Sequence, residues 1–161
     1  GDALTPVLPD VNAKAVFDVS VHPDSTFQTI TGIGGAFTES SAYLLSELSE
    51  KNRDSIIQAY FSDNGAKYSL CRTHINSCDF SLSSYAYDTV AGDTLLEHFS
   101  LEHEDRWMVP MIHAAQLASS EGFKLLTSPW TAPPWMKDNQ AWFGGKLLPR
   151  YYQVWANYFV K

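Results

Sequence analysis

The sequence predicts an α/β fold, and within that class the N-terminal portion of a (β/α)8 TIM barrel comprising about three βα units. Short apolar segments alternate with amphipathic helical segments, which is the order of a parallel sheet with crossover helices. The two longest loops follow strands rather than precede them, as in a barrel whose working face lies at the carboxyl ends of its strands. A complete barrel needs about 250 residues. The chain has 161 residues, so the sequence predicts only part of such a barrel.

Two strands are expected near the beginning of the chain. Residues 16–21 alternate loosely and are rich in Val and Phe, and Phe27–Thr31 is the second strand. The second strand runs directly into Gly32–Ala36, whose glycines let neighbouring backbone come close at a crowded strand end. A dinucleotide fingerprint would need a further glycine where Phe37 stands, so close packing is the better interpretation.

The next unit is expected between residues 49 and 100. Ser49 is the expected N-cap of a helix, and Gly65 is expected to end that helix as a left-handed residue. The apolar face of this helix consists of Ile56, Ile57, Tyr60 and Phe61. Tyr68–His74 is the following strand. The polar stretch 76–100 is longer than ordinary connections, which is typical of functional loops.

The last unit begins with a helix that Ser100 is expected to cap. Phe123–Ser128 is a short buried strand, and the loop Pro129–Pro149 that follows it is dense in Trp, Pro and Gly. A final amphipathic helix carries its apolar side chains at Tyr151, Val154, Trp155, Tyr158 and Phe159.

Charge and hydropathy narrow the class of protein. Eighteen acidic and 11 basic residues leave a formal net charge of -7, and the Lys and Arg residues are scattered. Nucleic-acid binding needs clustered Lys and Arg, so no nucleic-acid partner is expected. No apolar run approaches the ~18 residues of a membrane-spanning helix, so no membrane span is expected. Cys71 and Cys78 are too few for a disulfide framework and are expected to be buried free thiols.

Two predicted strand ends carry candidate binding residues. Arg72 ends a buried strand and needs an anionic partner, which Asp79 or a carboxylate from elsewhere in the barrel would provide. The pair is interpreted either as a structural ion pair or as a polar floor for a sugar. Trp130 and Trp135 follow the last strand, and indoles both stack on sugar rings and donate to hydroxyls. Core packing is the alternative, and it suits Trp135 better than Trp130.

The acidic and histidine residues near position 100 match no metal pattern. Glu97, His98 and the segment Glu102–Asp105 have suitable ligand types, but their spacing fits no zinc site. Acidic residues are also expected in the first turn of a helix because of its dipole. No metal and no cofactor are therefore expected. No pair of carboxylates stands out as the acid and nucleophile of a two-carboxylate glycosidase.

Four sequence blocks carry a family resemblance: residues 27–30, 32–39, 68–80 and 128–137. They include Cys-Asp-Phe-Ser at Cys78–Ser81 and Ser-Pro-Trp-Thr-x-Pro-x-Trp at Ser128–Trp135. Together and in this order they resemble the opening half of glycoside hydrolase family 30, of the glucosylceramidase (acid β-glucosidase) type. The similarity covers nearly the whole chain, from about residue 16 to Lys161.

The resemblance implies a (β/α)8 barrel with an accessory β-sandwich. Residues 1–26 would contribute to the sandwich, and residues 27–161 would form the first part of the barrel. It also implies a retaining β-glycoside hydrolase that uses one Glu as acid/base and another as nucleophile, without a metal. Both glutamates would lie beyond Lys161, so no catalytic residue is expected within this chain.

Residue by residue, the resemblance implies a sugar-binding role for this chain. Asp79 would accept glucose hydroxyls, Trp130 would donate to them, and Phe80 would line the mouth near the aglycone. Arg72 would support the two catalytic carboxylates. The chain departs from the family pattern close to this site, at His74, Ile75 and Asn76. These departures leave the non-sugar half of the substrate open.

The expected substrate is a β-glucoside such as glucosylceramide, and the remainder of the barrel and sandwich is expected to complete the fold. The alternatives are an endo-β-1,6-glucanase of the same family and a non-catalytic sugar-binding remnant. The resemblance implies a secreted, periplasmic or lysosomal protein. The 161 residues in isolation are expected to aggregate or to lack activity, because sheet edges and core would be open.

Overall fold

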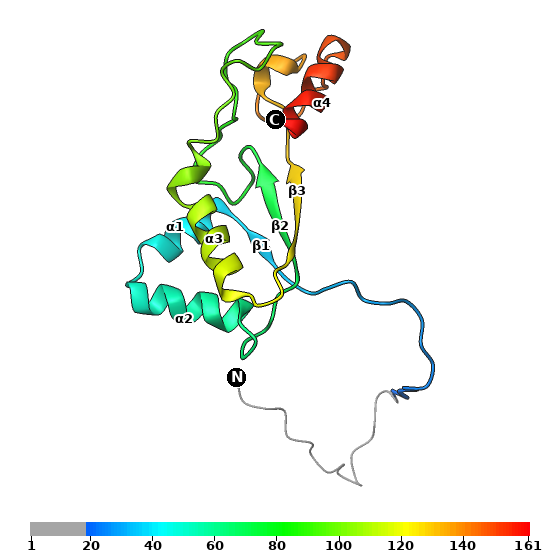
Figure 1. Ribbon diagram of the computed structural model, residues 1–161. Coiled ribbons are helices and arrows are strands. Elements are labelled where there is room, and N and C mark those ends of the chain that lie inside the picture. Colours follow the sequence, from blue (N-terminus) through cyan, green and yellow to red (C-terminus); the bar gives the residue numbers. More distant parts are fainter. Residues whose placement is uncertain (1–18) are drawn as a thin grey trace, which may run out of the picture.

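The computed structural model describes residues 19–161. The helices and strands follow one another as β1 (Ala36–Phe37), α1 (Glu39–Ser46), α2 (Glu50–Phe61), β2 (Leu70–Ile75), α3 (Met108–Ala118), β3 (Lys124–Pro129) and α4 (Tyr152–Val160). Short 3-10 turns lie at Glu104–Arg106, Pro134–Met136 and Pro149–Tyr151. The described strands form one parallel sheet in the order β1-β2-β3, which confirms the predicted α/β class (Figure 1).

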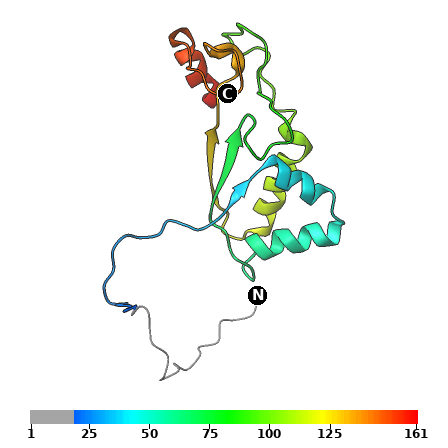
Figure 2. The same cartoon turned by 180° about the vertical axis from the view of Figure 1, so that it is seen from behind.

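The helices α1, α2 and α3 lie to one side of the sheet, as the two opposite views show (Figures 1 and 2). The core beneath them contains Phe37, Ala42, Leu45, Ile57, Phe61, Cys71, Met108 and Ala115. The Phe37 and Phe61 rings stack with centroids 5.6 Å apart, which joins β1 to α2. Because side chains alternate along a strand, Arg72 lies on the opposite face from Cys71. The face that carries Arg72 is the one that lines the inside of a closed barrel.

The glycine segment before β1 packs directly against β2, as predicted. A Cβ on Gly34 would lie 2.1 Å from the Leu70 carbonyl oxygen, so only glycine fits. The Ile33 carbonyl accepts from the Ser69 N–H, and the Gly35 carbonyl accepts from the Arg72 N–H. The close approach of backbone, rather than a nucleotide site, therefore explains this segment.

The strand predicted at Phe27–Thr31 is wrong. These residues are in no strand, and the Phe27 side chain is 91% exposed. No described segment lies beside them to pair with their backbone, so pairing with β2 starts only at Ile33. The strand predicted at residues 16–21 lies partly outside the described residues. Val19 and Val21, which are described, are exposed and in no strand.

The helix predictions were correct for α2 and α4 and incomplete for the others. Ser49 is the N-cap of α2, and its side chain accepts from the Asn52 N–H. Helix α1 was not predicted, although Thr38 caps it in a capping box. Gly65 is not left-handed; a Cβ there would lie 2.3 Å from the Ala59 carbonyl oxygen, and Lys67 adopts the positive φ instead.

Helix α3 begins eight residues later than its predicted cap. The Ser100 hydroxyl accepts from the Glu102 N–H, but a 3-10 turn intervenes before Met108. Pro110 lies in the first turn of α3, where a backbone N–H has no intrahelical acceptor and its loss is tolerated.

The two long loops and α4 form a second hydrophobic core beyond the carboxyl ends of β2 and β3, in the upper part of Figure 1. Its buried members are Leu96, Ala132, Met136, Val154 and Tyr158. Val154 and Tyr158 lie on the predicted apolar face of α4. Because the loops share this core with a helix, they hold fixed positions without regular secondary structure.

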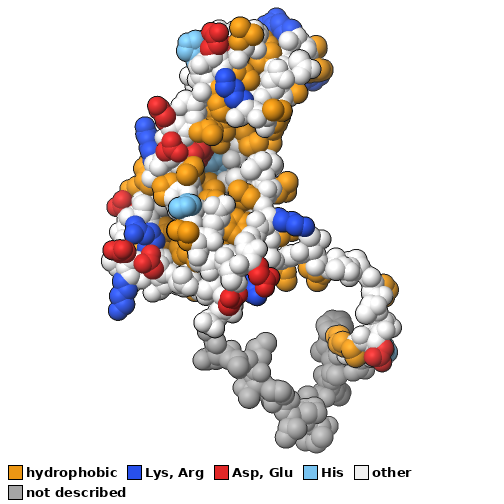
Figure 3. All heavy atoms as spheres, viewed as in Figure 1, with side chains coloured by type: hydrophobic (Ala, Val, Ile, Leu, Met, Phe, Trp, Pro, Cys, Tyr) orange, Lys and Arg blue, Asp and Glu red, His pale blue; other side chains and the backbone are white. Residues whose placement is uncertain are grey.

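The inner face and the β3 edge of the sheet are open in this chain. Leu126 of β3 is 60% exposed, as expected for three adjacent strands of a larger barrel. On the face shown in Figure 3, the Lys and Arg side chains lie apart from one another. Among the described residues, no helix combines the length and apolar character required to cross a membrane.

Candidate active site

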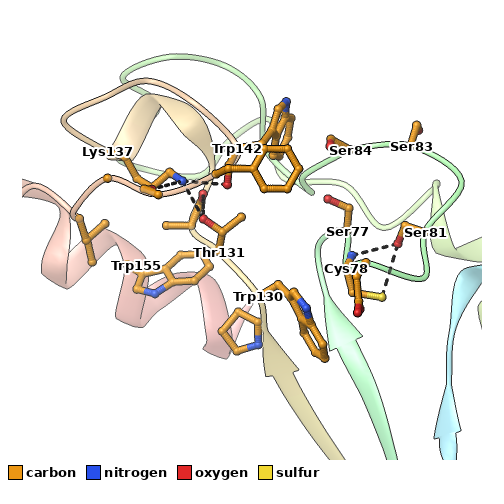
Figure 4. A pocket seen from close by; sticks show the side chains of 17 residues that line it. Ser77, Cys78, Ser81, Ser83, Ser84, Trp130, Thr131, Lys137, Trp142 and Trp155 are labelled. Carbon is orange, nitrogen blue, oxygen red and sulfur yellow. Dashed lines mark hydrogen bonds between the residues drawn. The ribbon is translucent and has the colours of Figure 1, made fainter.

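Two cavities open at the carboxyl ends of the strands. The larger, of about 750 Å³, is called the serine–tryptophan cavity (Figure 4). The side chains that give it this character are Ser77, Ser81, Ser83, Ser84, Trp130, Trp142 and Trp155. The smaller, of about 480 Å³, is called the apolar cavity and is lined among others by Ala36, Phe37, Leu44, Arg72 and Phe80. Both lie where α/β barrels place their working residues.

The two cavities share three residues, Cys78, Asp79 and Trp130. Asp79 comes from the loop after β2, and Trp130 directly follows β3. Arg72 and Phe80 line the apolar cavity. The structure thus brings together all four residues singled out in the sequence. Trp135 instead packs in the second core and donates from Nε1 to the Asp88 carbonyl at 3.1 Å, the structural role that was favoured for it.

The first turn of α1 holds the loop that carries Asp79. The Ser40 backbone N–H and hydroxyl donate to the Phe80 carbonyl at 3.0 and 2.7 Å. The buried Glu39 carboxylate accepts from the Leu82 N–H at 2.8 Å. The Asp79 side chain itself is exposed and has no hydrogen-bond or ion-pair partner among the described residues. The backbone of this loop is therefore held in place, and the Asp79 carboxylate is available to a ligand.

Arg72 is half-buried and faces away from the helices. Its Nε donates to the Ser128 hydroxyl at 2.8 Å, and its guanidinium carbon lies 4.2 Å from the centre of the Trp130 ring. The ion pair considered with Asp79 does not form; no carboxylate of residues 19–161 lies within 4 Å of the guanidinium. Ser128 and Trp130 determine the direction of the side chain instead.

A buried polar network behind the cavities was missed from the sequence. The Glu39 N–H donates to His74 Nε2 at 3.2 Å, and His74 Nδ1 donates to the Asn76 carbonyl at 2.6 Å. His103 Nε2 lies 2.6 Å from the Glu39 carboxylate. His103 also stacks on Tyr85 with ring centroids 3.7 Å apart. The network therefore joins α1, β2 and the loop after β2.

Glu104 extends this network. Its carboxylate accepts from the Tyr85 and Tyr87 hydroxyls at 2.6 and 2.9 Å. Burial, reinforced by the Glu104 charge, raises the pKa of both tyrosines, so both remain donors. Among the described residues no three His, Cys, Asp or Glu side chains are arranged to hold a metal ion. His103 and Glu104, whose spacing matched no metal pattern, have structural partners.

A buried lysine organises the other side of the serine–tryptophan cavity. The Lys137 ammonium donates to the Thr131 hydroxyl at 2.9 Å and to the Trp142 and Gly144 carbonyls, both at 3.0 Å. Lys137 is 4% exposed, and burial lowers its pKa, an effect that Asp138 partly offsets. No sequence pattern indicated this role. The three acceptors replace the hydration that the ammonium loses.

The two cysteines differ in environment. Both are free thiols, as predicted, but only Cys71 is buried, and burial raises its pKa. Cys78 is half-buried because its loop borders both cavities. Burial was therefore predicted correctly for one of the two.

A parallel α/β sheet with cavities at the carboxyl ends of its strands is the arrangement expected of part of a TIM barrel, and the comparison with known proteins identifies the family. Residues 30–161 match the family model described as the glycosyl hydrolase family 30 TIM-barrel domain. The chain belongs to glycosyl hydrolase family 30 and forms the N-terminal portion of its barrel.

Relatives and solved structures agree with this assignment. The lysosomal acid glucosylceramidase of Mus musculus is 39% identical over 149 residues, which are 89% of this chain and 29% of the relative. SrfJ from Salmonella typhimurium superimposes with a TM-score of 0.81 at 35% identity, over 86% of this chain and 31% of that one. An endo-β1,6-glucanase gives a TM-score of 0.77 at 34% identity, over 86% of this chain and 32% of that chain. The chain thus spans about a third of each relative.

Proposed function

We propose that the whole protein is a retaining β-glucoside hydrolase and that this chain binds the sugar next to the cleaved bond. The observation that carries the proposal is the position of Asp79 and Trp130 at the junction of the two cavities. Neither side chain has a hydrogen-bond partner among the described residues. A carboxylate can accept from sugar hydroxyls, and an indole can both stack on a sugar ring and donate to it.

Arg72 supports the same proposal. A half-buried guanidinium without an anionic partner is costly, and a carboxylate from the rest of the barrel would offset that cost. Retaining glycosidases carry two carboxyl groups about 5–5.5 Å apart, one as acid/base and one as nucleophile. We place both on glutamates outside this chain. Arg72 would then position these carboxylates, while Asp79 and Trp130 orient the sugar.

The test is an activity assay of the full-length protein. We expect it to release the aglycone of a fluorogenic β-glucoside but not of the matched α-glucoside, and to give β-glucose as the first product in NMR spectra. A protein that binds glucose yet cleaves neither substrate would be the non-catalytic remnant instead. The 161 residues alone are expected to be inactive, because both catalytic carboxylates and most of the barrel are missing.

Glucosylceramide-like β-glucosides are the proposed substrates, since the mouse relative is a glucosylceramidase. Endo-β-1,6-glucan cleavage is the second candidate, favoured by the solved endo-β1,6-glucanase that this chain resembles. We further propose that residues 1–26 contribute to an accessory β-sandwich, that residues 27–161 form the first part of the barrel, and that the protein is lysosomal, periplasmic or secreted.

A further inference from the structure

The serine–tryptophan cavity is larger than one sugar ring requires. Its volume of about 750 Å³ lies within the range of roughly 300–1,000 Å³ that encloses whole drug-sized ligands. Asp79 and Trp130 lie, with Cys78, only at its border with the apolar cavity. The rest of the cavity has no role in the proposed binding of the first sugar.

The walls of this remaining space are chemically complementary to a sugar. Figure 4 shows Trp142 and Trp155 on one side and the serines of the loop after β2 on the other. Ser83 and Ser84 are exposed and have no hydrogen-bond partner among the described residues. An indole covers the apolar C–H face of a pyranose, while hydroxyls bond to its rim. An acyl chain would leave these serine hydroxyls unpaired.

The loop that carries Trp142 is fixed before any ligand binds. Lys137 holds its backbone at the Trp142 and Gly144 carbonyls. At the base of the loop, the Asp138 N–H donates to the Lys146 carbonyl, and the Lys146 N–H donates to the Asp138 carboxylate at 2.8 Å. A loop ordered in advance loses little conformational freedom on binding, which favours a binding surface.

We propose that this part of the serine–tryptophan cavity is a second sugar subsite, with Trp142 stacking on the ring and Ser83 and Ser84 bonding to its hydroxyls. The proposal rests on the proposed function, because the second ring is linked to the sugar that Asp79 and Trp130 hold. A glycan that occupies both cavities passes Asp79 and Trp130, as an enzyme acting within a chain requires. The subsite therefore favours the second candidate substrate, a β-linked glucan of at least two rings, over a glucosylceramide-like lipid.

The experiment compares two substrates of the full-length protein, methyl β-glucoside and a β-1,6-linked glucose trisaccharide. Trp142→Ala is expected to lower kcat/KM for the trisaccharide about tenfold and to change it less than about twofold for methyl β-glucoside. Trp142→Phe keeps an aromatic face and should recover most of the loss. Tyr152→Ala, which removes an exposed ring that lines neither cavity, is the matched control and should change neither value.

Equal losses on both substrates, or no loss on either, would overturn the subsite. If Trp142→Ala does not fold, the double variant Ser83→Ala, Ser84→Ala provides the same comparison with a loss of about threefold. Calorimetric binding of the trisaccharide separates the two proposals. A wild-type protein that cleaves neither substrate disproves the hydrolase function, whereas trisaccharide binding that Trp142→Ala leaves unchanged disproves the subsite.

Discussion

The serine–tryptophan cavity and the apolar cavity meet at Asp79 and Trp130 but differ in the side chains beyond that border. The first combines indoles with serine hydroxyls, whereas the second is lined mainly by aliphatic and aromatic side chains, with Arg72 at its inner face. Asp79 and Trp130 thus line two cavities of different chemical character. We propose that the shared residues select the sugar and that the unshared residues select what is attached to it.

The largest effect is expected where the cavities meet. Asp79→Ala should lower kcat/KM of the full-length protein roughly 100-fold on every β-glucoside, because charged hydrogen bonds to the sugar are lost. Steady-state kinetics on methyl and alkyl β-glucosides measure this. Asp105→Ala removes an exposed carboxylate with no hydrogen bond among the described residues and serves as the control. An unchanged kcat/KM would remove Asp79 from the sugar site.

The next largest effect is expected from Lys137, which holds the loop that carries Trp142 and therefore affects the serine–tryptophan cavity but not the apolar cavity. Lys137→Met should lower the free energy of unfolding by about 1–3 kcal/mol, because the Trp142 and Gly144 carbonyls and the Thr131 hydroxyl lose their donor. It should also weaken trisaccharide cleavage more than methyl β-glucoside cleavage. Denaturant unfolding and kinetics give both values. Lys146→Met, on an exposed side chain of the same loop, should change neither.

A smaller effect is expected in the apolar cavity. The Phe80 side chain is 61% exposed at its mouth, and Phe80→Ala removes an apolar surface that an alkyl aglycone would cover. We expect kcat/KM to fall about fivefold for octyl β-glucoside and to stay unchanged for methyl β-glucoside. The reverse order of effects would show that Phe80 does not contact the aglycone.

The smallest effect concerns the loop that supplies residues to both cavities. Asp88 is buried in this loop, and one of its carboxylate oxygens has no partner among the described residues. Burial raises the pKa of Asp88, a hydrogen bond from the Val90 N–H opposes the rise, and the Asp93 charge adds to it. The folded state therefore holds the proton more tightly than the unfolded state, and stability falls as the pH rises from the ordinary Asp pKa through the raised one.

Asp88→Asn removes this titration. The free energy of unfolding of the variant should exceed that of wild type by about 1 kcal/mol at pH 7, and this difference should vanish near pH 3. Denaturant unfolding of the full-length protein at the two pH values measures the difference. A variant that is less stable at pH 7 would mean that the Asp88 charge has a partner outside residues 19–161.

The sequence predicted the parts of this fold that depend on local pattern. The parallel order of β2 and β3, the Ser49 cap and the apolar face of α4 all follow from spacing and composition. The strand at Phe27–Thr31 failed because a strand also requires a neighbour, which local composition does not reveal. Helix α1 was missed because Thr38 and Ser41 are a weaker capping signal than Thr with Glu or Gln.

The residues of the candidate site that lie at or just after the strand ends could be predicted from the sequence, whereas the buried contacts that support the loops could not. Asp79, Phe80, Trp130 and Arg72 stand in recognisable sequence blocks, and they lie together in the structure. The contacts of Lys137 and of the pair His103 and Glu39 depend on how distant loops pack. A single sequence contains no spacing that would indicate such contacts, so the proposed second sugar subsite could be inferred only from the structure.

The most direct test of the central claim is a crystal structure of the full-length protein with a non-hydrolysable β-glucoside bound. The account predicts a glucose ring at the border of the two cavities, with its hydroxyls on the Asp79 carboxylate and the Trp130 Nε1–H. It also predicts that two carboxylates from outside this chain lie near Arg72. A glucose ring bound elsewhere, with Asp79 and Trp130 free of contact, would contradict the claim.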